Sequence, residues 1–229
     1  RVADEARTML GALHRIQTLS REARGAAGGT LRLASFPMVF STVLPPVLRR
    51  FRQLHPEIDV ISLEATDDEV ETLLAAGTVD MGVVLNAAPG RQVCPLGQDE
   101  WMAVLPAAHP LARARGAIAL AELAAEPFVL ATGGCSVHAQ TLAADAGLAI
   151  TDVRASVRDW ASAFALVRDG LGVTLVPALT LPESRRGLRV LRLASPLYRS
   201  FGLAASGQAA DSGPVRALFA MLQRDDKAE

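Results

Sequence analysis

Short buried strands alternate with amphipathic helices along this chain, and this alternation limits its fold more than any other feature. From Thr30 onward, the pattern predicts strands at 31–35, 58–65 and 79–85 and helices at 39–54 and 68–76. Strand–helix–strand order is typical of a parallel sheet that is covered by helices on both faces. The first half of the chain is therefore expected to form one α/β unit, and Pro45 and Pro46 are expected to kink its first helix or delay its start.

The same rhythm starts again after His109 and Pro110. Two strands are expected within 93–106, and the second unit is expected to contain strands at 127–131, 150–157 and 173–177 and helices at 136–146 and 160–169. Late strands at 189–194 and 201–206 and a closing helix at 213–224 remain. We therefore predict an α/β fold of two Rossmann-like lobes joined by two crossovers, with hinges near Pro106 and Ala205. Lobe I comprises 28–106 plus 206–229, and lobe II comprises 107–205.

Residues 1–27 are predicted to be a separate linker segment. Its helical pattern over 2–24 carries a mostly apolar stripe that includes Met9 and Ile16. No second element within the segment covers that stripe, so we expect it to pack on another chain or on a part of the protein outside this sequence. A terminal helix folded back on the body is the alternative.

Composition excludes several classes of function. The 23 basic and 24 acidic side chains give a net charge of −1, so no global basic field attracts nucleic acid. Two cysteines, Cys94 and Cys135, make no disulfide framework and favour a reducing cytoplasm. No segment approaches the roughly 20 apolar residues of a membrane span. We therefore expect a cytoplasmic protein with no membrane contact.

Four segments in order add a family resemblance. They read GTLRLASFPMVFSTVLPPVLRRFRQLHPEIDVISLE, LLAAGTVDMGVV, AVLPAAHPLA and LVRDGLGVTLVP, within residues 28–224. Together they resemble the effector-binding domain of LysR-type transcriptional regulators. The resemblance implies a type 2 periplasmic-binding-protein-like fold, a preceding linker helix, and a homodimer or homotetramer. It also implies a small effector bound between the lobes, and DNA contact only through a winged helix-turn-helix absent from this chain.

Candidate contacts lie in the loops after the strands, where ligands of such folds bind. In lobe I they are Ser35, Phe36, Met38, Thr66 and Asp67. Several relatives are expected to bind a carboxylate with Ser or Thr at the position of Met38, so methionine favours a partly apolar effector over a small dicarboxylate. Packing in a lid is the alternative role of Met38. Thr66 or Asp67 is expected to cap the next helix, and Asp67 could also bind a ligand amine or hydroxyl.

In lobe II the candidate contacts are Thr132, Gly133, Gly134, Cys135, Ser136, Asp159 and Trp160. Two glycines expose backbone N–H groups and Ser136 is expected to cap the next helix, an arrangement that suits an anion. Asp159 and Trp160 begin another helix and resemble the remaining wall of the site. Trp160 is expected either to cover the apolar part of a ligand or to pack in the core.

Two further hypotheses concern Cys135. A thiol at a helix N-terminus has a lowered pKa and can sense oxidants, but Cys94 lies in the other lobe and is not a suitable resolving cysteine. Cys135, Ser136 and His138 place a nucleophile beside a base without an orienting acid. His14, His55 and His109 have no metal-ligand spacing. We expect no catalytic residues, no metal and no cofactor.

The leading hypothesis is thus the ligand-sensing domain of a DNA-binding regulator. A solute-binding protein of a transport system, which has the same two-lobed fold, is the alternative. The predicted helix at 2–24 favours the regulator, because a solute carrier has no use for an exposed apolar stripe ahead of its first strand.

Overall fold

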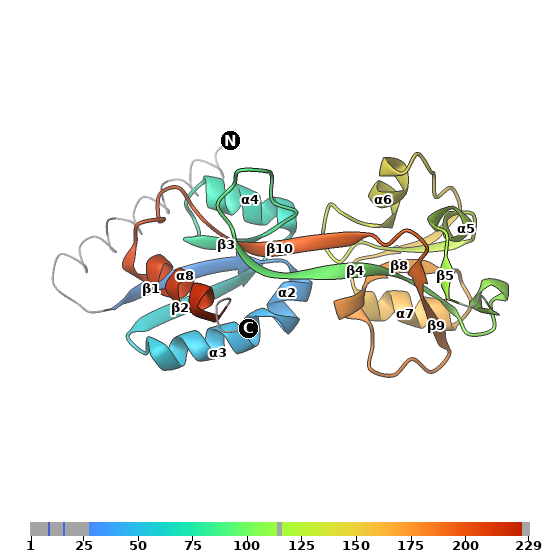
Figure 1. Ribbon diagram of the computed structural model, residues 1–229, viewed down its shortest axis with the longest axis horizontal. Coiled ribbons are helices and arrows are strands. Elements are labelled where there is room, and N and C mark those ends of the chain that lie inside the picture. The colour runs from blue at the N-terminus through green and yellow to red at the C-terminus, as the bar shows by residue number, and fades with distance from the viewer. Residues whose placement is uncertain (1–8, 10–15, 17–27, 114–115, 226–229) are drawn as a thin grey trace. The chain divides into compact units, whose positions relative to one another are not determined.

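The computed structural model describes residues 9, 16, 28–113 and 116–225 (Figure 1). The chain divides into two compact units. Unit 1 takes the described residues up to Gly97 and from Ser200 onward, and unit 2 is Gln98–Arg199. The chain therefore crosses between the units twice, within β4 (Cys94–Pro106) and within β10 (Tyr198–Ala205). The sequence-based division put the crossings at the C-terminal ends of these same strands.

Unit 1 is a mixed sheet with helices on both faces. Besides its parts of β4 and β10, its elements are β1 (Gly29–Ser35), α2 (Pro37–Thr42), α3 (Leu44–Leu54), β2 (Ile58–Glu64), α4 (Asp67–Ala75), β3 (Met81–Leu85) and α8 (Gly213–Asp225). The strand order is β2-β1-β3-β10. The first three strands are parallel and β10 runs antiparallel to β3. β1 thus pairs in parallel with both β2 and β3, and the parallel sheet that the strand–helix alternation predicted is present.

Alternate residues of β1 face different helices, because successive side chains of a strand point to opposite faces. Ala34 packs with Val70 and Leu74 of α4. Leu31 and Leu33 are fully buried on the other face. A side chain at Gly29 on that face would meet Pro214 of α8 at 2.9 Å. Figure 1 shows α4 on one face of the sheet and α3 with α8 on the other.

Unit 2 is built around the second half of β4. Its further elements are η1 (Pro110–Arg113), β5 (Ala117–Ile118), α5 (Leu120–Ala124), β6 (Phe128–Ala131), α6 (Ala139–Asp145), β7 (Val153–Val157), α7 (Trp160–Arg168), β8 (Thr174–Pro177), η2 (Ala178–Thr180) and β9 (Leu188–Leu193). β4 pairs antiparallel with β8 and β9, and β5 is parallel to β9. β6 and β7 form a parallel pair.

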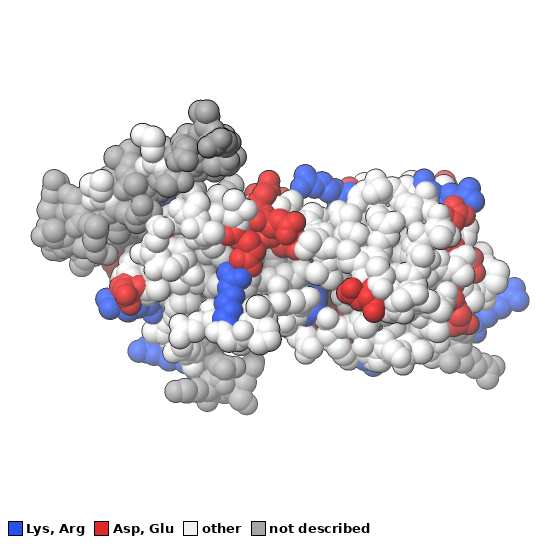
Figure 2. All heavy atoms as spheres, turned by 90° about the horizontal axis from the view of Figure 1, so that it is seen from above, with Lys and Arg blue, Asp and Glu red and all other residues white. Residues whose placement is uncertain are grey.

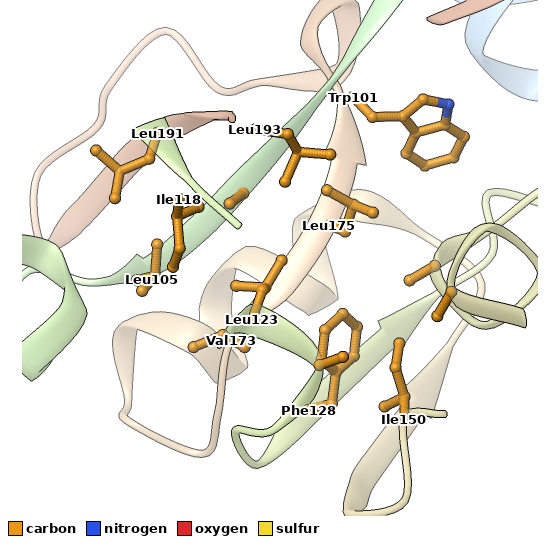
Figure 3. Close-up of a cluster of buried hydrophobic side chains, with 14 of the residues drawn as sticks. Trp101, Leu105, Ile118, Leu123, Phe128, Ile150, Val173, Leu175, Leu191 and Leu193 are labelled. Carbon is orange, nitrogen blue, oxygen red and sulfur yellow. The ribbon is translucent and has the colours of Figure 1, made fainter. Parts of the chain in front are cut away.

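An apolar cluster fills unit 2 (Figure 3). Leu105, Ile118, Leu123, Phe128 and Leu175 belong to it and are at most 1% exposed. Trp101 lies at one end of the cluster, and its ring is buried. β4 therefore supplies both a hydrogen-bonding partner for two strands and part of the core.

Several sequence-based predictions of elements need correction. The stretch 93–106 was predicted to hold two strands, which is wrong: β4 is one strand of 13 residues. Gly97 within it is a point of close approach, because a Cβ there would lie 3.1 Å from the ring of Phe201. The single helix predicted over 39–54 is two helices, and the expected effect of Pro45 and Pro46 is confirmed, since both lie in the first turn of α3. β5 and α5 were not predicted at all.

The predicted helix at 2–24 lies outside the described residues, apart from Met9 and Ile16. Both of these residues are helical, and their side chains are 73% and 64% exposed.

Candidate ligand-binding site

The loop that follows β1 is closely packed. Ser35 and Phe36 are fully buried, and Met38 is 3% exposed. The Ser35 hydroxyl donates to the carbonyl of Phe36 at 3.3 Å. The Phe36 ring meets the ring of Phe201 edge-on, with centroids 6.5 Å apart. The Met38 sulfur accepts a hydrogen bond from the Thr42 hydroxyl at 3.3 Å. Met38 is thus held in a fixed position.

The loop after β2 lies beside this first loop, because β1 and β2 are parallel neighbours. The Ala65 N–H donates to the Ser35 carbonyl at 3.0 Å. Thr66 caps α4 in a reciprocal arrangement: its hydroxyl accepts from the Glu69 N–H at 3.2 Å, and its own N–H donates to the Glu69 carboxylate at 2.8 Å. The predicted cap is confirmed, and Thr66 rather than Asp67 provides it.

The start of α4 is strongly acidic. Asp67, Asp68 and Glu69 occupy its first turn, and Figure 2, which views the molecule from above, shows acidic side chains gathered over this helix. Carboxylates near a helix N-terminus already complement the helix dipole. This end of α4 therefore disfavours an anion and suits a hydroxyl or an amine.

The loop after β6, from Thr132 to Ser136, is shaped by two glycines with positive φ. Gly133 and Gly134 have φ of 62° and 72°. The Gly133 N–H donates to the Arg158 carbonyl at 2.9 Å, and the Cys135 N–H donates to the Thr132 carbonyl at 3.0 Å. These two amide groups are engaged within unit 2, which leaves fewer backbone donors for an anion than the sequence suggested.

The prediction that Ser136 caps the next helix is wrong. α6 begins at Ala139, after the N-cap residue His138, and the Thr141 hydroxyl accepts from the His138 N–H at 3.0 Å. Cys135 consequently does not lie at a helix N-terminus. Its side chain is 6% exposed, and Cys94 belongs to unit 1. The physical reason given for a reactive Cys135 thiol therefore does not hold.

Asp159 and Trp160 form the start of α7 beside the glycine loop. The Ser162 N–H donates to the Asp159 carboxylate at 2.7 Å, which makes Asp159 the N-cap. Hydrogen bonding from Ser162 also lowers the pKa of the Asp159 carboxyl below its ordinary value. The Trp160 indole lies against Gly133, because a Cβ at Gly133 would be only 2.1 Å from Cζ2 of Trp160. Structure thus brings Trp160 and the glycine loop together within unit 2.

One polar atom of this group stands out. The indole Nε1 of Trp160 is buried and has no hydrogen-bond partner among the described residues. A buried N–H without an acceptor costs about 1–3 kcal/mol, so such groups usually have a partner. An acceptor on a bound ligand would satisfy this donor.

Sequence reasoning missed a second group of buried polar residues in unit 2. Asp99 and Arg199 form an ion pair whose side chains are each 1% exposed. The sequence of β10 does indicate that Arg199 is buried. Alternate side chains of a strand face the same way, and Arg199 lies two and four residues before the buried Phe201 and Leu203. The described residues hold no group of three or more His, Cys, Asp or Glu side chains that could bind a metal ion. Among them no helix is long and apolar enough to cross a membrane.

Comparisons with known proteins place this geometry in a family. The sequence matches the LysR substrate binding domain over residues 24–227. The probable HTH-type transcriptional regulator LrrA of Synechococcus elongatus is 29% identical over 204 residues, which are 88% of this chain and 68% of that protein. A probable hydrogen peroxide-inducible genes activator of Mycobacterium avium is 32% identical over 188 residues, covering 75% of this chain and 58% of that protein.

Among solved structures, the C-terminal domain of a probable LysR family transcriptional regulator from Rhodococcus sp. RHA1 has the same fold. It superposes with a TM-score of 0.73 at 27% identity, over 86% of this chain and 99% of that chain. The predicted α/β fold of the type 2 periplasmic-binding-protein kind is confirmed. The chain therefore belongs to the LysR substrate binding domain family, the effector-binding part of LysR-type transcriptional regulators, which is not enzymatic.

Proposed function

We propose that this domain senses a small monoanion with an apolar body and signals its presence to a winged helix-turn-helix outside this chain. The observation that carries the proposal is the buried Trp160 indole N–H beside Gly133, which has no acceptor among the described residues. In this proposal the effector supplies that acceptor. The proposed ligand contacts are those of the twelve predicted residues that keep exposed surface, namely Thr66, Thr132, Gly134, Ser136, Asp159 and Trp160.

Charge distribution supports a proposed orientation of the effector. The acidic first turn of α4 repels a carboxylate, so the anionic end is assigned to unit 2. The Trp160 indole N–H and the Thr132 hydroxyl are donors there. The partly exposed face of the Trp160 ring is the proposed apolar contact, since Phe36 and Met38 are buried beneath the loop surface. A dicarboxylate is disfavoured, because its second charge would have to lie near Asp67.

In this proposal the domain regulates transcription through the effector that it binds and the DNA-binding head to which it is linked. A ligand that binds two arrangements of the units with different affinities shifts their populations, and the linked DNA-binding head transmits the shift. We propose a cytoplasmic homodimer or homotetramer that contacts DNA only through that head. The exposed side chains of Met9 and Ile16 support self-association, because they lie on the predicted apolar stripe.

The effector class can be tested with three probes of similar size: benzoate, its neutral amide benzamide, and succinate. A ligand that binds only the folded state raises the melting temperature in proportion to its occupancy. We expect benzoate to raise it, and we expect benzamide and succinate to raise it less. Trp160→Phe removes the indole N–H and keeps an aromatic ring, so it should abolish the preference for benzoate over benzamide.

Gln140→Ala is the matched control, because Gln140 is an exposed residue of α6 in the same unit. This variant should keep the wild-type response to all three probes. A larger shift with succinate than with benzoate would overturn the proposed effector class, and an unchanged preference in Trp160→Phe would overturn the role of Trp160.

A further inference from the structure

Asp99 and Arg199 lie at the two places where the chain crosses between the units. Asp99 is the second residue of unit 2 on β4, and Arg199 is its last residue on β10. The Arg199 Nη2 donates to Oδ2 of Asp99 at 3.1 Å, with both side chains 1% exposed. One buried ion pair therefore joins both crossing strands inside unit 2.

Further contacts within unit 2 fix the position of this pair. The guanidinium carbon of Arg199 lies 5.5 Å from the centroid of the Trp101 ring, within cation–π distance. Figure 3 shows Trp101 at the end of the apolar cluster. The other oxygen of Asp99 accepts from the Leu179 N–H at 3.1 Å, in the turn after β8. The pair thus contacts both β4 and the turn after β8 within unit 2.

The unit 1 side of each crossing has a different chemistry. Phe201 packs on the backbone at Gly97, where an added Cβ would lie 3.1 Å from the ring. Ser200 exchanges two hydrogen bonds with Asn86: the Ser200 N–H donates to the Asn86 side chain at 2.8 Å, and the Asn86 N–H donates to the Ser200 carbonyl at 2.8 Å. β4 is therefore held on both sides of the Gly97–Gln98 peptide link, and β10 is held on both sides of the Arg199–Ser200 peptide link.

A buried ion pair adds little net stability. Its desolvation cost is comparable to its attraction, and replacement by apolar groups of similar volume is often neutral. Its geometry, in contrast, is specific, because guanidinium and carboxylate must stay aligned to remain hydrogen-bonded. This pair is consequently better suited to fixing the direction of two strands than to stabilising unit 2.

We propose that Asp99 and Arg199 are positioning residues that lock both crossing strands to unit 2 and confine any bending between the units to the two short links. The relevance of this lock to effector sensing rests on the proposed function, whereas its mechanical role does not. Without the lock, the crossing segments inside unit 2 would also bend, and the units would sample a wider range of arrangements.

Spin-label distance measurements test the lock without any ligand. One label pair at Gln53→Cys and Gln140→Cys spans the units, and a second pair at Gln140→Cys and Ser184→Cys lies within unit 2. All three wild-type side chains are exposed. Cys94→Ser and Cys135→Ala provide the background, and dilution with unlabelled protein restricts the signal to distances within one chain.

The double variant Asp99→Asn/Arg199→Met removes both charges and keeps similar volumes and the acceptor for Leu179. We expect a broader inter-unit distance distribution, an unchanged distribution within unit 2, and a melting temperature close to that of the wild type. The matched control is Glu100→Gln/Arg192→Met. It removes a two-bond ion pair at 2.9 and 2.8 Å that also starts on β4 but ends on β9, which does not cross. This control should leave both distributions unchanged.

An inter-unit distribution of wild-type width in the folded double variant would overturn the proposal, as would equal broadening in the control. Should the double variant fail to fold, Arg199→Lys is measured instead, because it keeps the charge and loses the planar guanidinium. The lock then predicts broadening with Arg199→Lys, and an unchanged width overturns it. A negative result would leave the effector experiment unaffected, since no probe molecule takes part.

Discussion

At the scale of single residues, Gly170 and Gly172 show how one sequence signature can serve two physical needs. Gly170 has φ of 82° just after α7, the left-handed conformation that commonly closes a helix. Gly172 is needed for a different reason, the close approach of another backbone segment. A Cβ there would meet the carbonyl oxygen of Pro127 at 2.3 Å. The sequence does not reveal the role of Gly172, because Pro127, the residue that it contacts, is distant in the chain.

We predict that Gly172→Ala destabilises the domain more than Gly170→Ala does. At Gly170 nothing lies within 4 Å of the added Cβ, so the cost is that of the left-handed backbone, about 1–2 kcal/mol. At Gly172 the obstacle is backbone, which must shift and strain the bond from the Val173 N–H to the Pro127 carbonyl, now 2.8 Å. Urea denaturation of both variants measures the difference, and equal losses of unfolding free energy would contradict the prediction.

At the scale of elements, periodicity located most long helices and buried strands but not the short elements. β2 and α7 were predicted almost to the residue, since their apolar patterns and caps are local. α5 has five residues, too few for a helical period to show. The start of α6 was misplaced by three residues, because Ser136 has a side chain typical of a cap, whereas α6 begins at Ala139 and the Thr141 hydroxyl accepts from the His138 N–H. Likewise the loops of the candidate site were predictable from strand ends, whereas the burial of Met38 depends on tertiary packing.

We predict a pH-dependent contribution of the Asp159 cap to the stability of α7. The folded carboxyl has a lowered pKa, so its stabilisation is complete above the unfolded-state pKa of about 3.9 and is lost as pH falls through the lower folded-state value. Asp159→Ala should therefore lower the melting temperature at neutral pH, and the gap to the wild type should narrow below about pH 4. Asp159→Asn keeps the cap without titrating, and its own melting temperature should lack this dependence. A gap that stays constant with pH would rule out the charged cap as the cause.

At the scale of the whole molecule, two edge strands offer surfaces for the proposed self-association. β2 lies at the edge of the unit 1 sheet, where Ile61 and Leu63 are 58% and 47% exposed. β7 is the outer strand of its pair in unit 2, and Val153 on it is 36% exposed. Exposed apolar edges of this kind favour pairing with another chain. Unit 1 of one copy against unit 2 of another is the arrangement we propose.

We predict that Ile61→Lys weakens this association. A lysine at a buried interface must be desolvated, whereas Thr72→Lys places the same charge on an exposed position of α4 in the same unit. Light scattering over a concentration series should show a lower mass for Ile61→Lys than for the wild type and an unchanged mass for Thr72→Lys. A strictly monomeric wild type would contradict the proposed homodimer and favour a solute-binding role.

The double crossing also has a consequence for biosynthesis. Unit 2 is one uninterrupted stretch, Gln98–Arg199, whereas unit 1 is completed only by the residues from Ser200 onward. Those residues supply most of β10, which pairs with β3, and all of α8, which begins against β1. Since domains tend to fold as units during synthesis, unit 2 can fold as soon as it leaves the ribosome. The sheet of unit 1 must wait, with one edge of β3 unpaired, until the last segment of the chain arrives.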